Sequence, residues 1–110
     1  MKATPIPQAS RDLVRARDRH RCQRCAVPAP NGHWHHRRRR NIRDAHTHCP
    51  CNGVWLCGHC HIPWAHGNPT EAKAEGFILP TWVAEPWTVG FRTPLGIVLP
   101  DCHGGFSLGT

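Results

Sequence analysis

Apolar positions in this chain form short runs and no long periodic stretch. Residues 11–19 are mostly charged, with Leu13, Val14 and Ala16 as their few apolar positions. We expect one helix there, with Ser10 as its N-cap. The apolar run 53–56 predicts a short strand, and residues 33–39, after an Asn-Gly turn signal, predict another.

Later elements are shorter. A helix over 60–66 is plausible, but Pro63 limits it to a turn or moves its start to that proline. Asn68 and Pro69 suit the N-cap and first position of a helix over 70–75, which Gly76 ends. Residues 77–83 and 97–99 predict strands, and 41–52 reads as a loop. The pattern predicts a small α+β fold.

The chain has 110 residues, which suits one domain. We expect residues 1–10 to form a flexible tail, 11–80 the main domain, and 81–110 a C-terminal extension with strands or a hairpin. With eleven Pro, ten Gly and no Tyr, such a chain buries little apolar area and needs a staple.

Seven Cys and ten His suggest the staple. The chain shows no charged-then-apolar leader and no apolar run near eighteen residues, so we expect a cytoplasmic protein without a membrane span. In a reducing compartment, paired cysteines are more often metal ligands than disulfides.

Two C-x-x-C pairs predict a four-sulfur zinc site formed by Cys22, Cys25, Cys57 and Cys60. Four thiolates leave no open position for water, so this zinc is expected to be structural. Disulfides or unpaired thiols are the alternative interpretation. Three further cysteines lack this spacing and are interpreted as spare: Cys49, Cys51 and Cys102.

The net charge is +7, and most of the Lys and Arg residues lie in the first 44 positions. A solvated charged face is the simplest interpretation of such a run. Its density beside possible metal ligands instead favours a polyanionic partner, most simply DNA. The residues expected to contact phosphates are Arg37, Arg38, Arg39, Arg40 and Arg43.

The order of motifs carries more information than each motif alone. A C-x-x-C pair precedes His35-His36-Arg37, and Asn52 precedes a second pair that is followed directly by His61. This arrangement resembles the HNH endonucleases, in particular the small zinc-containing members from tailed phages, over about two thirds of the chain. The resemblance implies a ββα-metal fold, in which two antiparallel strands and a helix surround one divalent ion.

The resemblance also implies roles. His35 and His61 take the metal-ligand positions, His36 the general-base position, and Asn52 the position that holds the strand pair and orients the base. His66 matches a third ligand, although the family separates the last two histidines by four positions. Here the separation is five, with Pro63 between.

The residue chemistry leads to the same expectation. A neutral imidazole can accept a proton from water near pH 7, and a divalent ion such as Mg²⁺, Mn²⁺, Ni²⁺ or Zn²⁺ can stabilise a phosphorane. We therefore expect a metal-dependent DNA endonuclease that nicks or cleaves. The resemblance to phage proteins implies the terminase of a phage packaging complex as one partner. The alternative is a non-catalytic zinc-dependent nucleic-acid-binding module.

Several residues have plainer interpretations. His35 and His36 could belong to a basic DNA-contact stretch, and Asn52 could be an ordinary Asn-Gly turn residue. The tryptophans at 34, 55 and 64 are expected to fill the core rather than to stack on bases. The remaining histidines were assigned no partner: His20, His33, His46, His48, His59 and His103.

Overall fold

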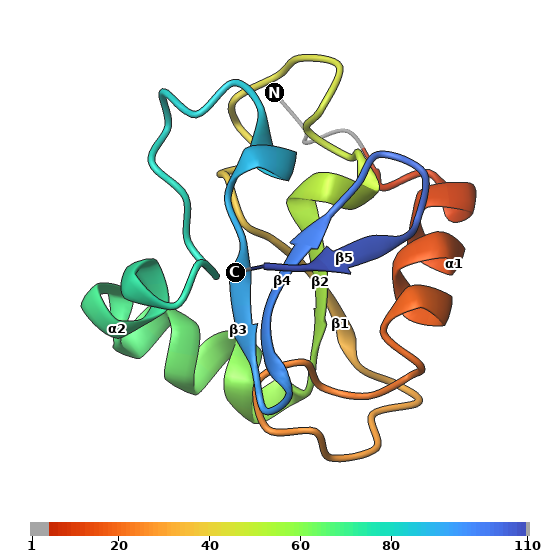
Figure 1. Ribbon diagram of the computed structural model, residues 1–110, viewed down its shortest axis with the longest axis vertical. Coiled ribbons are helices and arrows are strands. Elements are labelled where there is room, and N and C mark those ends of the chain that lie inside the picture. The colour runs from red at the N-terminus through yellow and green to blue at the C-terminus, as the bar shows by residue number, and fades with distance from the viewer. Residues whose placement is uncertain (1–4, 110) are drawn as a thin grey trace.

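The computed structural model describes residues 5–109 and shows a small α+β protein with two antiparallel sheets (Figure 1). Its helices and strands are α1 (Gln8–Arg17), β1 (His33–His36), β2 (Gly53–Leu56), α2 (Pro69–Ala74), β3 (Phe91–Thr93), β4 (Gly96–Pro100) and β5 (Phe106–Leu108). Two short 3₁₀ turns, Pro50–Asn52 and Pro86–Thr88, and one π-helix, Cys60–His66, complete the described elements. Among these residues, no helix is both long and apolar enough to cross a membrane.

Strand β2 lies at the centre of the fold. It pairs with β1, with Trp34 opposite Trp55 and His36 opposite Gly53. All four β2 residues are buried, because alternate side chains enter different clusters: Val54 and Leu56 join one, and Trp55 joins the other. A two-sided central strand needs cover on both faces.

Helix α1 covers one side of β2. Val14 packs in the cluster that contains the two paired tryptophans. At the helix end, the buried carboxylate of Asp18 binds the Arg17 guanidinium at 2.7 Å and accepts the Trp55 N–H at 2.9 Å. The hydrogen bond from Trp55 to Asp18 connects the helix terminus to the central strand.

The sheet β3-β4-β5 packs against the main core. Phe91 and Val98 join the cluster built on β2, the π-helix and Phe77. The extension 81–110 therefore folds back on the core rather than standing apart as a hairpin. The expected strand at 97–99 is confirmed within β4. Trp82, at the start of the extension, does not join this packing and is 82% exposed.

The buried tryptophans confirm the sequence interpretation. Trp34, Trp55 and Trp64 are each at most 6% exposed. Gly53 is required by one of them, since an added Cβ would lie 2.2 Å from the Trp34 ring. The packing of the Trp34 ring therefore depends on a glycine at the first position of β2, directly after the 3₁₀ turn.

The first helix differs from its prediction. It covers Gln8–Arg17 rather than 11–19, so residues 8–10, expected in the tail, are helical, and positions 1–4 lie outside the described residues. Ser10 is not a cap. Its hydroxyl is buried within the helix and donates a hydrogen bond to the carbonyl of His48.

The strand expected at 77–83 is wrong. Helix α2 ends in a Schellman motif, with Gly76 at φ +85° and hydrogen bonds from Phe77 to Ala72 and from Gly76 to Lys73. The chain then crosses the core as a loop, held by a bond from the Leu79 N–H to the Arg37 carbonyl. Its alternating burial reflects this crossing and not strand pairing.

Candidate metal centres and active-site cleft

The two C-x-x-C turns converge. Cys22 follows α1, Cys57 comes directly after β2, and Cys60 begins the π-helix, so the cluster joins three segments. The four sulfurs of Cys22, Cys25, Cys57 and Cys60 lie within 4.8 Å of one another. The Cys25 and Cys57 sulfurs are 3.9 Å apart, close to the about 3.8 Å edge of a tetrahedral zinc–thiolate site. The donor set fits zinc.

Arg24 closes this cluster from outside. Its guanidinium lies 3.7 Å from the Trp64 ring centroid, and its Nη1 lies 3.5 Å from the Cys60 sulfur. A cation at this place offsets negative charge on the thiolates. The backbone N–H of Cys60 also points to the Cys57 sulfur at 3.4 Å.

A histidine triad forms the second group. His35 projects from β1, and His61 and His66 project from the π-helix. One nitrogen of each lies within 4.8 Å of the others. The ring of His35 is 5.2 Å from that of His61 and 6.3 Å from that of His66, centroid to centroid. Three imidazoles suit a divalent transition metal.

The π-helix explains how His66 joins the triad despite the five-residue spacing. In a π-helix, bonding runs between residues five apart, so His61 and His66 lie on the same face. Pro63 lies inside this segment. A proline in an α-helix clashes with the carbonyl four residues earlier, and a wider turn relieves that clash.

Hydrogen bonds orient two of the three rings. The Nε2 of His35 lies 2.6 Å from the Phe77 carbonyl. Because a carbonyl can only accept, this nitrogen carries the proton and Nδ1 keeps its lone pair for a metal. The Nδ1 of His61 lies 2.8 Å from the Nδ1 of His33, a histidine that the sequence interpretation left without a partner.

Burial keeps these imidazoles neutral. It lowers the pKa of His35 to about 4, and burial followed by the nearby His33 and His66 lowers the pKa of His61 to about 4. Burial, then Arg40 and His48, lowers the pKa of His36 to about 3. Neutral rings are the forms that bind metals or accept protons.

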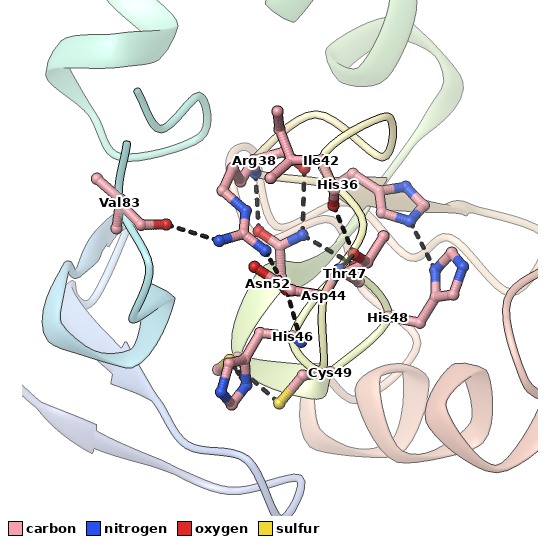
Figure 2. A network of polar contacts seen from close by, with 11 residues as sticks. His36, Arg38, Ile42, Asp44, His46, Thr47, His48, Cys49, Asn52 and Val83 are labelled. Atoms are coloured by element: carbon pink, nitrogen blue, oxygen red, sulfur yellow. Dashed lines mark hydrogen bonds and ion pairs between the residues drawn. The ribbon is translucent and has the colours of Figure 1, made fainter. Parts of the chain in front are cut away.

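His36 borders a cleft beside the triad. The cleft has a volume of ≈ 270 Å³ and is lined in part by His35, His36 and His66. Arg39 and Lys73 supply positive charge to its walls. The Nε2 of His36 lies 3.0 Å from the Nδ1 of His48, as Figure 2 shows.

Asn52 is fully buried and is more than a turn residue. Its Oδ1 accepts the Arg38 N–H at 2.7 Å, and its Nδ2 donates to the carbonyls of Arg38 and Thr47 (Figure 2). It therefore joins both ends of the loop 38–52, which carries His48. Asn52 was expected to orient the general base, His36. Its side chain bonds Arg38 and Thr47, so such an effect would act through this loop.

The arginine run divides into two parts. Arg37 and Arg38 are each 1% exposed, which contradicts their expected role in phosphate binding. Arg37 donates to five carbonyls, including those of Gly76, Cys51 and Pro86. Arg38 binds the Val83 carbonyl and the Asp44 carboxylate. Both guanidiniums therefore bond to groups of the protein itself.

The basic residues that follow Arg38 in the chain lie on the surface. Arg39, Arg40 and Arg43 are exposed on the loop that follows β1. This loop borders the cleft through Arg39. Of the five arginines expected to contact phosphates, these three are therefore the exposed ones.

A second sulfur cluster was missed. His46, Cys49, Cys51 and Cys102 place one ligand atom each within 4.8 Å of the others. The three cysteines were interpreted as spare because C-x-C is not the usual knuckle. A histidine three residues before Cys49 was the available sequence signal, but the fourth ligand lies 51 residues after Cys51 in the chain.

Comparisons with known proteins give no further assignment. No family model matches the chain, and no curated protein or solved structure gives a significant match. The structure thus contains two cysteine-rich four-ligand clusters and a histidine triad that could bind metal ions such as zinc.

Proposed function

We propose that this protein is a metal-dependent endonuclease of the HNH type that hydrolyses DNA phosphodiester bonds. The observation that carries the proposal is the convergence of His35, His61 and His66 beside a cleft that His36 also lines. A second imidazole next to a possible metal centre, but not part of it, is what water activation requires.

The donor set of the triad fits a divalent ion such as Mg²⁺, Mn²⁺, Ni²⁺ or Zn²⁺, with imidazole favouring the last two. Such an ion would supply Lewis acidity to the phosphate and to the leaving oxygen. The chain supplies the rest. His36 accepts the proton of the attacking water, and His48 holds the ring of His36 at 3.0 Å.

Substrate binding is assigned to the exposed basic residues. Arg39, Arg40 and Arg43 follow β1 at the cleft, and Lys73 contributes from α2. A net charge of +7 raises the local concentration of a polyanion. Arg37 and Arg38 support this surface only by fixing its backbone.

The test is a plasmid assay. Supercoiled DNA is incubated with the protein and Mg²⁺, Mn²⁺ or Ni²⁺, and again with EDTA. We expect metal-dependent nicking that His36→Ala lowers by about 10²–10⁴-fold, the usual contribution of a general base. His59→Ala, at an exposed position two residues before the triad, is the matched control and should retain activity.

The result also separates the alternative function. Tight, salt-sensitive DNA binding without nicking under any of these ions would replace the enzyme by a zinc-dependent nucleic-acid-binding module. Full activity in a folded His36→Ala variant would remove His36 from the mechanism.

A further inference from the structure

We propose that His46, Cys49, Cys51 and Cys102 bind a second structural zinc ion, which fastens the C-terminal extension to the loop before β2. This inference is independent of the proposed nuclease activity. It concerns a site built from residues that neither the C-x-x-C pairs nor the histidine triad uses.

The four ligand atoms form a compact group in which all lie within 4.8 Å of one another. The sulfurs of Cys49 and Cys51 are 3.1 Å apart, and the Cys51 sulfur is 4.0 Å from the Nδ1 of His46. A zinc ion with these donors needs sulfurs about 3.8 Å apart and a sulfur–nitrogen edge of about 3.6 Å. The two sulfurs would therefore move apart by about 0.7 Å on binding an ion, which rotation of the Cys49 and Cys51 side chains can supply.

The backbone around the site is fixed from both sides. On the extension, the Asp101 carboxylate accepts the N–H groups of His103 and Gly105 and shapes the β4–β5 loop that presents Cys102. On the other side, Asp44 accepts the His46 N–H, and Trp87 packs edge-on to the His46 ring at 4.8 Å. Ligands held in this way lose little entropy on binding.

Buried positive charge lies beside the site. Arg17 donates to the Pro50 carbonyl at 2.9 Å, and Arg37 donates to the Cys51 carbonyl at 3.1 Å. Both guanidiniums are buried within the protein. Zinc with three thiolates and a neutral imidazole carries one net negative charge, which the Arg37 guanidinium offsets, since the charge of Arg17 is already paired with Asp18.

The ligand types select the ion and its role. Thiolates favour zinc over magnesium or calcium, and three cysteines with one histidine form a closed structural set. Binding releases the protons of the three thiols, and no electron is transferred. The competing chemistry is a disulfide that uses Cys102 and one cysteine of the C-x-C turn.

The position of the site gives it a consequence for the cleft. The loop 38–52 that ends in this cluster also carries His48 and Asn52, which contact His36 and Arg38. An ion bound to this cluster would tie the loop 38–52, which borders the cleft through Arg39, to the β4–β5 loop. The C-terminal extension would then help to hold this loop in place.

The first experiment counts zinc and thiols in the intact wild-type protein. After dialysis against EDTA to remove weakly held ions, native mass spectrometry should give two zinc ions per chain. Alkylation in denaturant without reductant should modify all seven cysteines. One retained zinc, or a pair of cysteines protected from alkylation, would overturn the proposal.

The second experiment assigns the ion to the cluster. Cys102→Ala should lower the retained zinc from two ions to one, whereas the neighbouring His103→Ala should keep two. Replacement of zinc by Co²⁺ gives a second readout, which also serves a variant of lower stability. The sulfur-to-cobalt charge-transfer absorption increases with the number of bound thiolates. The absorption should correspond to seven bound thiolates in the wild type and to four in Cys102→Ala. An unchanged spectrum would contradict the assignment. His61→Ala should leave both counts unchanged, since the triad is a separate site.

Discussion

Arg37 shows how one residue can organise several segments. Its guanidinium donates to carbonyls of the 3₁₀ turn before β2, the end of α2, and the segment leading to β3. Burial, together with the nearby Arg17, lowers its pKa to about 9, which leaves the side chain charged at neutral pH. The planar group satisfies carbonyls that water cannot reach.

Arg37→Lys tests this arrangement. A lysine ammonium cannot reach five carbonyls, so buried acceptors lose their partners. We expect a loss of about 2–4 kcal/mol in the free energy of unfolding, measured by urea denaturation with zinc present. Arg39→Lys, at the exposed position two residues later, should change it by less than about 0.5 kcal/mol. Equal effects of the two substitutions would show that burial of Arg37 contributes nothing.

The sequence could not separate these arginines. Residues 37–40 are four identical letters, and only the packing of segments from 76 and 86–90 buries the first of them. The neighbouring His35 and His36 stand out in the sequence through the order of motifs, which does not depend on burial. Contacts such as those of His33 and His48 depend on side-chain reach and had no sequence signal.

His48 is expected to position His36. Its Nδ1 meets the Nε2 of His36, and its main-chain carbonyl accepts the Ser10 hydroxyl. Asn places an amide atom near the location of Nδ1, whereas Gln places it further along the side chain. We therefore expect His48→Asn to retain more nicking activity than His48→Gln, with the difference in kcat rather than in KM or in stability.

A purely structural contribution predicts a different ranking. If His48 only fills space, the larger Gln should be tolerated at least as well as Asn, and unfolding midpoints should follow activity. The kcat values and unfolding midpoints of both variants decide between the two interpretations.

At the scale of elements, the π-helix determines the ligand geometry. An α-helix has 3.6 residues per turn, so two residues five apart point about 140° away from each other. The π-helix Cys60–His66 removes this divergence. The proline within it is the sequence feature that opposes α-helical bonding.

Pro63→Ala removes that opposition. We expect the segment to gain α-helical character and the triad to bind Ni²⁺ or Zn²⁺ about tenfold more weakly, as isothermal titration calorimetry would show after the sulfur sites are filled. Ile62→Ala, at the exposed neighbouring position, is the control and should bind as the wild type does. Unchanged affinity in Pro63→Ala would mean that packing alone maintains the wide turn.

Element prediction succeeded where local chemistry was sufficient. The run 53–56 matches β2, and the Asn-Pro start and Gly76 stop come within one residue of α2. It failed at 77–83, where alternate burial arises from a loop that crosses the core. Strands β3 and β5 have three residues each, too few to leave a periodic signal.

At the scale of the whole molecule, the two cysteine-rich clusters connect parts of the chain that lie far apart. The first cluster spans residues 22–60 and the second spans 46–102. A C-x-x-C pair repeated after a long loop is recognisable in a sequence. The second cluster is not, because it requires the extension to fold back before Cys102 meets the C-x-C turn.

Zinc removal should therefore unfold the protein. Structural zinc supplies on the order of 10–16 kcal/mol, which exceeds the stability expected of so small a core. A strong thiol-competing chelator should abolish the near-ultraviolet circular dichroism of the buried tryptophans, and added zinc should restore it. EDTA at the concentration used in the plasmid assay should leave that signal intact. A native spectrum after complete zinc loss would show that the apolar core suffices.

The wide turn around Pro63 has a consequence for how such proteins are recognised. The π-helix accommodates one residue more than an α-helical turn would. The residues after His66 therefore have the orientation that they would have in a chain one residue shorter. A chain without the extra residue would align the same two imidazoles by ordinary α-helical geometry. Searches that demand a fixed histidine interval will accept that shorter chain and pass over this one, although the two present the same ligands.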